Sequence, residues 1–403
     1  MKSVVFLCDG MADWPCDALG GKTPCEVAKH PNMDWLAQNG QFGLAQTVPQ
    51  GMPPGSDTAN LSVFGYDPKI YYTGRSPLEA VNMGIPLDLK DVTYRCNTVT
   101  LSGGDSIEDC IMADYSAGEI TSEESRQLIE ALDRHFRTDK LELYPGVSYR
   151  HCLVLRDAPD GAQLTPPHDI SGKPVRDCLP KGQNSELLLS MMKYSYEVLK
   201  DHPVNRKRIA EGKNPANCLW FWGEGRKPNL TSFAEKFGVT RGGVISAVDL
   251  IRGIGRCAGL EVIPVDGVIT GTFETDFAAK GRAAIQAFKD GHQFVYIHME
   301  APDECGHHGQ LKEKVFSIEE IDSKVIGPVM EYLRGCGEDY SALIMPDHPT
   351  PMKVMTHVSD PVPFALFDSR APMKNDAVYT EAAAKATGVF VPQACTLMER
   401  LVK

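Results

Sequence analysis

Three short apolar runs, each of strand length, lead within a few residues to an aspartate. The runs and their aspartates are Val4–Leu7 with Asp9, Phe294–His298 with Asp303, and Ala342–Met345 with Asp347. In open α/β sheets, functional sites form beyond the carboxyl ends of the strands. If these strands are parallel neighbours, the three carboxylates should meet at one edge of a sheet. A single aspartate after a strand is usually a turn or cap residue, so the prediction rests on the three occurring together.

Histidines accompany two of these aspartates. His307 follows Asp303 by four residues, His348 follows Asp347 directly, and His357 comes ten residues after Asp347. Carboxylate and imidazole groups without thiolates suit manganese, zinc or magnesium better than a soft structural zinc site. Together with Asp9, these aspartates and histidines are more ligands than one catalytic ion requires. Two ions about 4 Å apart would use them, and such pairs are typical of phosphoryl transfer.

Three other polar residues near these runs are not predicted to bind an ion. Because His307 already has the i+4 relation to Asp303, His308 is left as an ordinary histidine. His298 and Glu300 are expected to support the site or the fold.

A serine that could act as a nucleophile lies in the stretch Pro53–Pro68, PPGSDTANLSVFGYDP. Ser56 follows Gly55 and opens a short helical run that Gly65 is expected to end. The N–H groups and dipole at a helix N-terminus favour phosphate, although most serines in this position only cap the helix. A divalent ion can lower the pKa of a serine hydroxyl and so make it a nucleophile. The aspartates and histidines therefore favour Ser56 as the group that receives a phosphoryl group.

The elements around these residues are expected to alternate between strand and helix. Pro31–Gly40 reads as a short helix and Val244–Leu260 has helix-like apolar spacing. Glu261–Val265 reads as a buried strand, and Lys314–Leu333 reads as a long amphipathic helix. This alternation predicts an α/β fold with a mostly parallel central sheet and helices on both faces.

At 403 residues, the chain is too long for one ordinary core, so two or three domains are expected. The pattern changes between about Tyr71 and Leu230. There we expect strands at Thr98–Leu101, Tyr149–Leu155 and Asn217–Trp222, a helix after the capping box of Thr121 and Glu124, and a helix at Ser185–Lys200. We therefore predict a discontinuous domain, 1–70 with 231–403, and an inserted smaller α/β or α+β domain, 71–230.

The composition argues against several classes of function. The chain has 41 basic and 53 acidic residues and a net charge of −12, so no nucleic-acid partner is expected. Its 12 cysteines form no CxxC pair, which favours reduced, buried thiols over a disulfide framework. The apolar run before Cys8 is too short for a secretory signal and no segment reaches membrane length, so we expect a cytoplasmic protein without a membrane partner.

Motifs spread over most of the chain point to one family. They are CDGMADWP at 8–15, LGGKTPCEVA at 19–28, PPGSDTANLSVFGYDP at 53–68, YTGRSPLEA at 72–80, YRHCLVL at 149–155, PPHDISG at 166–172, HPVNRKRIAEGKNPAN at 202–217, HMEAPDECGHHG at 298–309 and PDHPTP at 346–351. With these motifs in this order, the chain resembles the archaeal-type cofactor-independent phosphoglycerate mutases of the alkaline phosphatase superfamily.

The resemblance implies an alkaline-phosphatase-like sandwich with two divalent ions (manganese, zinc, magnesium or cobalt) and no 2,3-bisphosphoglycerate. It implies that one ion is held by Asp9, Ser56, Asp347 and His348 and the other by Asp303, His307 and His357. Ser56 would take the phosphate from one hydroxyl of glycerate and return it to the other, interconverting 3- and 2-phosphoglycerate in glycolysis and gluconeogenesis. The partner would be a small phosphorylated hydroxy acid, and the oligomeric state stays open.

The resemblance also implies that the inserted domain is a transferase-type substrate domain, which must hold the glycerate carboxylate and move a proton. Arginine suits carboxylate and phosphate. The candidates for substrate binding are Arg75, Arg95, Arg150, His168, Arg208 and Lys280. The candidates for acid–base catalysis beside Ser56 are His151 and Asp169.

Three other functions remain open. Some bacterial chains that resemble this family have been proposed as homoserine kinases, and the same serine and ions could pass phosphate to that acceptor. A phosphatase or phosphodiesterase would release phosphate to water, which a long inserted domain with basic residues disfavours. A binding protein without catalysis would have lost the nucleophile or the ligands, and all of them are present.

Overall fold

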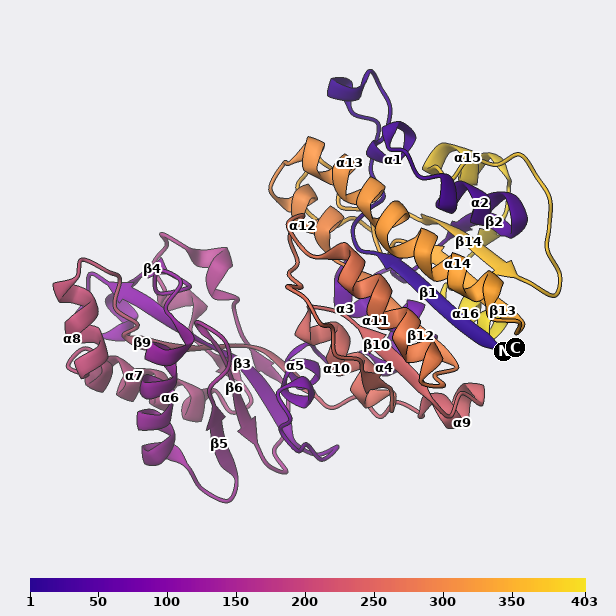
Figure 1. Ribbon diagram of the computed structural model, residues 1–403. Coiled ribbons are helices and arrows are strands. Elements are labelled where there is room, and N and C mark those ends of the chain that lie inside the picture. The colour runs from indigo at the N-terminus through magenta and orange to yellow at the C-terminus, as the bar shows by residue number, and fades with distance from the viewer. The chain divides into compact units, whose positions relative to one another are not determined.

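The computed structural model describes all residues, 1–403, and the chain divides into two compact units (Figure 1). Unit 1 comprises Met1–Tyr72 and Asn229–Lys403, and unit 2 comprises Thr73–Pro228. The boundaries that the sequence predicts, 70/71 and 230/231, lie close to these positions. Unit 2 is thus an insertion in the sequence of unit 1.

An eight-stranded sheet forms the centre of unit 1, in the order β11-β10-β12-β1-β13-β14-β2-β15. Its strands are β1 (Lys2–Cys8), β2 (Gln41–Ala45), β10 (Gly242–Ile245), β11 (Glu261–Val262), β12 (Phe294–Met299), β13 (Tyr340–Met345), β14 (Val362–Asp368) and β15 (Phe390–Val391). Neighbouring strands are parallel except at β13–β14 and β14–β2. The register places Leu7 of β1 beside both His298 of β12 and Met345 of β13. The predicted parallel neighbours are therefore confirmed, and they end at one edge of the sheet.

Helices cover both faces of this sheet (Figure 1). They are α1 (Pro24–Val27), α2 (Pro31–Asn39), α3 (Ser56–Val63), α4 (Pro68–Tyr71), α9 (Phe233–Phe237), α10 (Asp249–Cys257), α11 (Phe277–Lys289), α12 (Ala301–His307), α13 (Leu311–Glu320), α14 (Gly327–Gly335), α15 (Glu381–Ala386) and α16 (Cys395–Val402), with the short turns η1 (Asp17–Leu19) and η5 (Ile321–Ile326). One group includes α2, α11, η5 and α14, and another includes α3, α10 and α16. Because both faces are covered, β1 is buried along its whole length, as the apolar run Val4–Leu7 within it predicts.

The long helix predicted at Lys314–Leu333 is interrupted. It consists of α13, one π-helical turn (η5) and α14. Asp322 in this turn is buried, and its Oδ1 accepts a hydrogen bond from the backbone N–H of Met33 at 2.8 Å. The π-helical turn thus brings a carboxylate to the N-terminus of α2, where it caps the helix.

The prediction of a helix over Val244–Leu260 is wrong at its start. Gly242–Ile245 is strand β10, paired in parallel with β12, and helix α10 begins only at Asp249. A Cβ at Gly243 would clash with Ile263, so the strand depends on close packing that apolar spacing does not reveal. The strand predicted at Glu261–Val265 is shorter, since β11 contains only its first two residues.

Unit 2 is built on a five-stranded antiparallel sheet in which β9 joins the path β4-β3-β6-β5 by pairing with β3. The strands are β3 (Val92–Ser102), β4 (Ile111–Asp114), β5 (Leu141–Tyr144), β6 (Arg150–Leu155) and β9 (Cys218–Arg226), and β7 (Ala162–Gln163) pairs separately with β8 (Lys181–Gly182). The helices are α5 (Ser76–Asn82), α6 (Ser122–Phe136), α7 (Ser185–Leu199) and α8 (Pro203–Ala210), with the 3₁₀ turns η2 (Ile107–Asp109), η3 (Pro167–Ile170) and η4 (Arg176–Cys178). The predicted capping box of Thr121 and Glu124 begins α6. The α/β class with a mostly parallel sheet and a smaller second domain is confirmed.

The cysteines and the helices have two further properties. All 12 cysteines are free thiols, and Cys8, in β1, and Cys305, in α12, are among those that are buried. None of the helices combines the length and the apolarity that crossing a membrane would require.

Candidate active site

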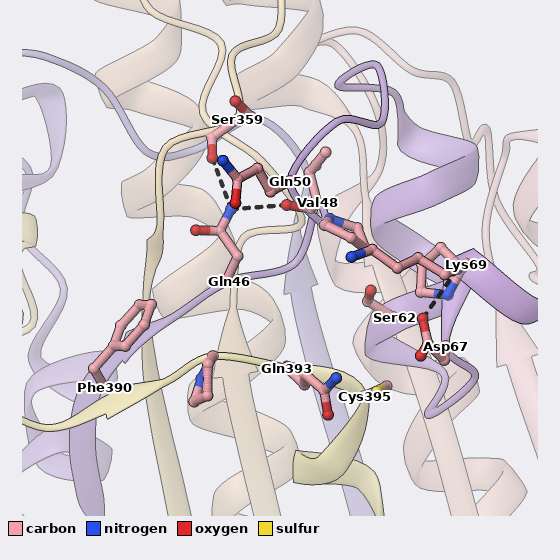
Figure 2. Close-up of a pocket in the computed structure, with 13 residues that line it drawn as sticks. Gln46, Val48, Gln50, Ser62, Asp67, Lys69, Ser359, Phe390, Gln393 and Cys395 are labelled. Carbon is pink, nitrogen blue, oxygen red and sulfur yellow. Dashed lines mark hydrogen bonds between the residues drawn. The ribbon is translucent and has the colours of Figure 1, made fainter.

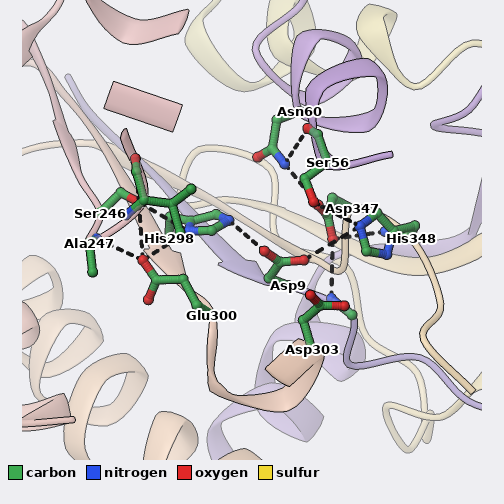
Figure 3. Close-up of polar contacts among 12 residues, drawn as sticks. Asp9, Ser56, Asn60, Ser246, Ala247, His298, Glu300, Asp303, Asp347 and His348 are labelled. Atoms are coloured by element: carbon green, nitrogen blue, oxygen red, sulfur yellow. Dashed lines mark hydrogen bonds and ion pairs between the residues drawn. The ribbon is translucent and has the colours of Figure 1, made fainter. Parts of the chain in front are cut away.

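The carboxyl ends of β1, β12 and β13 bring the three predicted aspartates into one buried cluster, Asp9, Asp303 and Asp347 (Figure 3). Asp347 is fully buried, and its Oδ1 accepts hydrogen bonds from the backbone N–H groups of Gly10 at 3.2 Å and His348 at 2.9 Å. Gly10 has a φ of +59°, and a Cβ there would clash with Asp303. Glycine therefore allows the chain after β1 to approach the other two aspartates.

Ser56 is the first residue of α3, and its hydroxyl lies 3.2 Å from Nε2 of His348. Asn60, one turn later, donates from Nδ2 to the carbonyl of Ser56 at 2.9 Å and to Oδ2 of Asp347 at 2.8 Å. Its Oδ1 accepts the hydroxyl of Tyr296 at 2.7 Å. The start of α3 is thereby fixed to the aspartate after β13, and Figure 3 shows Ser56 facing this aspartate and His348.

A second group of side chains surrounds Asp303. Nε2 of His307 lies 3.3 Å from Oδ2 of Asp303, and Nε2 of His357 lies 3.3 Å from Oδ1. These two nitrogen atoms are 2.8 Å apart. The hydroxyl of Thr350 donates to Oδ1 of Asp303. The ring of His348 stacks on that of His357 at a centroid distance of 3.8 Å, so His348 links this group to Ser56.

These donor atoms fit divalent cations. Oδ1 of Asp9 is buried without a hydrogen-bond partner, and the imidazole nitrogens of His307 and His357 converge on one carboxylate. Ligand atoms within 4.8 Å of one another form two groups, Asp9 with His298 and Asp347, and Asp303 with His348 and His357. This grouping differs from the expected one, which placed His348 with Asp9 and omitted His298.

The electrostatics of the cluster also favour bound positive charge. Burial, and then the charges of Asp347 and Asp303, raise the pKa of Asp9 well above its ordinary value. Burial alone would raise the pKa of Asp303, but hydrogen bonds from His307 and His357 hold it well below its ordinary value. A cation placed among these carboxylates would relieve their mutual repulsion.

The contact of His298 with Asp9 was not predicted from the sequence. This histidine lies inside the apolar run of β12 and is fully buried, which is typical of a core histidine. In the structure its Nε2 lies 3.0 Å from Oδ2 of Asp9. The available signal was its register, because a residue beside Leu7 near the end of β12 must lie close to the sheet edge that carries Asp9.

Within unit 2, three predicted arginines lie around one glutamate. Nε of Arg75 is 2.9 Å and Nε of Arg95 is 3.0 Å from the carboxylate of Glu79. The pKa of Glu79, which burial alone would raise, is lowered by Arg95 and Arg75 and also by Arg150. The guanidinium of Arg95 lies 4.0 Å from the ring centre of Trp222. These side chains form a cationic cluster with one balancing carboxylate.

The predicted His168 and Asp169 lie beside this cluster. The ring of His168 meets that of Trp222 edge-on at a centroid distance of 5.2 Å. Burial, and the charges of Arg95 and Arg75, lower the pKa of His168. Asp169 is exposed, with its Oδ1 3.6 Å from Nε2 of His168. The structure therefore keeps this pair near the arginines.

Three other candidates are buried and occupied by contacts within the fold. Arg208 uses its three guanidinium nitrogens to bond the carbonyls of Asn214 and Ala117 and the carboxylate of Glu124. His151 accepts the backbone N–H of Gly146 at 3.1 Å, and burial lowers its pKa to about 3. Lys280 in unit 1 donates to the carbonyl of His298 at 2.9 Å and contacts Glu300. These roles support the fold, so we leave the three residues out of the proposed substrate site.

A cavity of about 410 Å³ lies outside this cluster, beside the loop that leads to Ser56 (Figure 2). Gln46 lines it and donates from Nε2 to the carbonyls of Val48 and Ser359, each at 2.8 Å. Ser359 is two residues beyond His357. The amide of Gln46 therefore joins the segment before Ser56 to the segment that carries His357.

Comparison with known proteins identifies the family. The family model of the 2,3-bisphosphoglycerate-independent phosphoglycerate mutases matches residues 37–205. A probable 2,3-bisphosphoglycerate-independent phosphoglycerate mutase of Geobacter sulfurreducens is 50% identical over 404 residues, covering 100% of both chains. The chain belongs to this mutase family. The family that its motifs resemble is thereby confirmed.

Other relatives extend the likeness over the whole chain. The 2,3-bisphosphoglycerate-independent phosphoglycerate mutase of Methanothrix thermoacetophila is 48% identical over 402 residues and covers 100% of both chains. A solved structure of a protein from Pyrococcus horikoshii has a TM-score of 0.81 at 30% identity, covering 100% of this chain and 97% of that one. Phosphoglycerate mutases are isomerases, so the enzyme class that the sequence predicts is also confirmed.

Proposed function

We propose that this mutase interconverts 3-phosphoglycerate and 2-phosphoglycerate through a phosphoserine formed at Ser56. The observation that carries the proposal is the position of Ser56 at the start of α3, with its hydroxyl 3.2 Å from Nε2 of His348. Two groups of carboxylates and imidazoles lie beside it. The reaction belongs to glycolysis and gluconeogenesis, and we propose that it takes place in the cytoplasm.

Two divalent ions are proposed as cofactors. Their ligands would be Asp9, Ser56, Asp347 and His348 for one ion and Asp303, His307 and His357 for the other. When bound, the ions would supply positive charge that lowers the pKa of the serine hydroxyl and stabilises the phosphoryl group. Oxygen and nitrogen ligands without thiolates suit manganese, zinc, magnesium or cobalt.

The residues of α3 perform the transfer. Oγ of Ser56 attacks phosphorus while the bond between phosphorus and O3 of the substrate breaks, and the serine proton ends on O3. The backbone N–H groups in the first turn of α3 bind the transferred phosphoryl group. O2 of glycerate then attacks the phosphoserine, and its proton returns to Ser56. The cycle therefore consumes no cofactor and leaves the enzyme unchanged.

The cluster of unit 2 is proposed to bind the substrate carboxylate. Arg75, Arg95 and Arg150 present guanidinium groups, which bind carboxylates in a planar, paired geometry. His168 and Asp169 are proposed to orient the hydroxyls or move a proton between them. Arg95→Ala should therefore raise the KM for 3-phosphoglycerate more than it lowers kcat.

A direct assay tests the proposal. Metal-depleted protein reconstituted with manganese is given 3-phosphoglycerate, and in parallel homoserine with a nucleotide. Formation of 2-phosphoglycerate that stops on chelation and returns with manganese is the expected result. Turnover of homoserine alone would replace the mutase assignment with a kinase. Release of free phosphate without isomerisation would replace it with a phosphatase.

A further inference from the structure

His298 is clamped between two carboxylates in the core of unit 1. It is fully buried at the end of β12. Its Nε2 lies 3.0 Å from Oδ2 of Asp9, and its Nδ1 lies 3.1 Å from Oε1 of Glu300. Figure 3 shows the ring between these two acids. Both ring nitrogens therefore face carboxylate oxygens.

The acid on the far side of the ring is itself fixed. Oε1 of Glu300 accepts the backbone N–H of Ala247 at 2.7 Å and the hydroxyl of Ser246 at 3.0 Å. The other carboxylate oxygen contacts the ammonium of Lys280, which is fully buried. Lys280 thus offsets the charge of Glu300, and the two residues that follow β10 supply two hydrogen-bond donors. Glu300 can hold the ring in one orientation because it cannot turn away without losing these partners.

This arrangement determines how Asp9 is presented. Its Oδ2 is directed to His298, whereas its Oδ1 lies 3.6 Å from Nε2 of His348 and has no hydrogen-bond partner. We propose that His298 is a positioning residue for the ion of Asp9: it holds Oδ2 so that Oδ1 faces the cation. This inference rests on the proposed function, because it assumes that Asp9 binds an ion.

Direct ligation is the alternative role that the experiment must separate from positioning, because His298 also lies within reach of an ion shared with Asp9 and Asp347. A histidine that binds the ion would point one nitrogen at the metal and use the other to orient the ring. Here Nε2 approaches Asp9 itself and Nδ1 is held by Glu300 and by Ser246, whose hydroxyl lies 3.2 Å away. A histidine that acts through Asp9 can be replaced by a side chain that keeps only the donor at Nε2, whereas a ligand cannot.

Two amide substitutions, His298→Gln and His298→Asn, test the proposed positioning role. The amide nitrogen of glutamine replaces Nε2 of histidine, and that of asparagine replaces Nδ1. Binding of Mn²⁺ to the metal-free full-length protein is measured by calorimetry without substrate. We expect two ions in the wild type, a loss of about 10- to 100-fold in affinity for one of them in His298→Asn, and a clearly smaller loss in His298→Gln. The visible spectrum of bound Co²⁺ should be the same in His298→Gln and wild type.

His292→Gln is the matched control. His292 is also buried, with Nδ1 3.0 Å from the carbonyl of Ala287 and Nε2 3.0 Å from Glu261, and it lies outside the cluster. Its replacement should leave Mn²⁺ affinity unchanged. If His298→Asn does not fold, Ser246→Ala removes one support of the ring and should weaken the same ion by a smaller factor.

Each other outcome counts against the inference. Equal losses in His298→Asn and His298→Gln would show that bulk packing matters rather than the contact with Asp9. Complete loss of one ion with an altered Co²⁺ spectrum in His298→Gln would make His298 a ligand. Unchanged affinity in both variants would remove the role while leaving the proposed function intact. A wild type that binds no ion would overturn the proposed function and this inference together.

Discussion

Asn60 joins the proposed nucleophile to the aspartate after β13, and its replacement offers a quantitative test. Its side chain is fully buried and forms three hydrogen bonds, two from Nδ2 and one to Oδ1. Leucine has nearly the same size but can form none of them. Asn60→Leu should therefore change the orientation of Ser56 and Asp347 without opening a large cavity.

The size of the effect follows from these bonds. The bond from Nδ2 to the carboxylate of Asp347 is 2.8 Å long, and a bond to a charged group contributes about 1.5–3 kcal/mol. If that energy holds Asp347 in its reactive orientation, its loss corresponds to about a 10- to 150-fold lower kcat/KM. The same change leaves the buried hydroxyl of Tyr296 unpaired, so the free energy of unfolding should also fall by about 2–4 kcal/mol.

Tyr296→Phe is the control that separates position from stability. It removes only the hydroxyl that donates to Asn60 and keeps the stacking of this ring on Phe64, at a centroid distance of 4.0 Å. Steady-state kinetics with 3-phosphoglycerate and urea denaturation are measured for both variants. We expect Tyr296→Phe to lose about 1 kcal/mol of stability and little activity. A folded Asn60→Leu protein with wild-type kcat/KM would refute the view that Asn60 positions the reacting groups.

Three further predictions concern the fold. Burial lowers the pKa of His151 to about 3, so below about pH 6.5 the unfolded chain binds a proton that the folded chain does not. Unit 2 should therefore lose about 2 kcal/mol of stability between about pH 7 and pH 5. Urea denaturation should find this loss in the wild type and not in His151→Asn. Lys314→Met leaves Asp13 buried without the ammonium group that lies 2.8 Å away, and it should lower the free energy of unfolding by about 3–5 kcal/mol. An unchanged free energy of unfolding would mean that this ion pair adds nothing to stability. Gln46→Ala removes the hydrogen bonds that join the loop before Ser56 to the segment after His357. Backbone amide hydrogen exchange should therefore become faster in residues 47–55. Unchanged exchange would show that other contacts hold this loop.

The part of the site that the sequence predicts is the part fixed by strand ends. The runs before Asp9, Asp303 and Asp347 are mainly apolar because their strands are buried on both faces, so they are recognisable without tertiary information. Parallel pairing then brings their ends together. Ser56 could be placed on a helix N-terminus from its local sequence alone, and the helix does begin there.

Other features depend on partners distant in sequence. The proposed role of His298 depends on Glu300 and on Asp9, which follows another strand, so the only signal in the sequence is the position of this histidine near the end of its apolar run. Arg208 resembles a substrate ligand in sequence, yet it is buried against the turn at Ala117, whose φ of 49° a local pattern does not reveal. Burial, more than residue type, separates such structural side chains from those available to a substrate.

The errors in the helices predicted at 244–260 and 314–333 also arise from partners distant in sequence. Val244 and Ile245 fit a helical apolar pattern, but β12 offers them a parallel pairing that outweighs this local preference. In the π-helical turn that interrupts the long helix, Asp322 accepts a hydrogen bond from Met33, a partner far away in sequence. Local spacing therefore predicts the existence of these elements better than their boundaries.

The central claim is that Ser56 carries the phosphate during turnover, and trapping that intermediate tests it most directly. The manganese-loaded enzyme is mixed with 3-phosphoglycerate, quenched in acid, digested with trypsin and examined by mass spectrometry. We predict one phosphoryl group on Ser56 in the peptide His30–Lys69, and neither phosphopeptide nor 2-phosphoglycerate from Ser56→Ala. Formation of 2-phosphoglycerate by a folded Ser56→Ala protein, or phosphate trapped on a different residue, would contradict the claim.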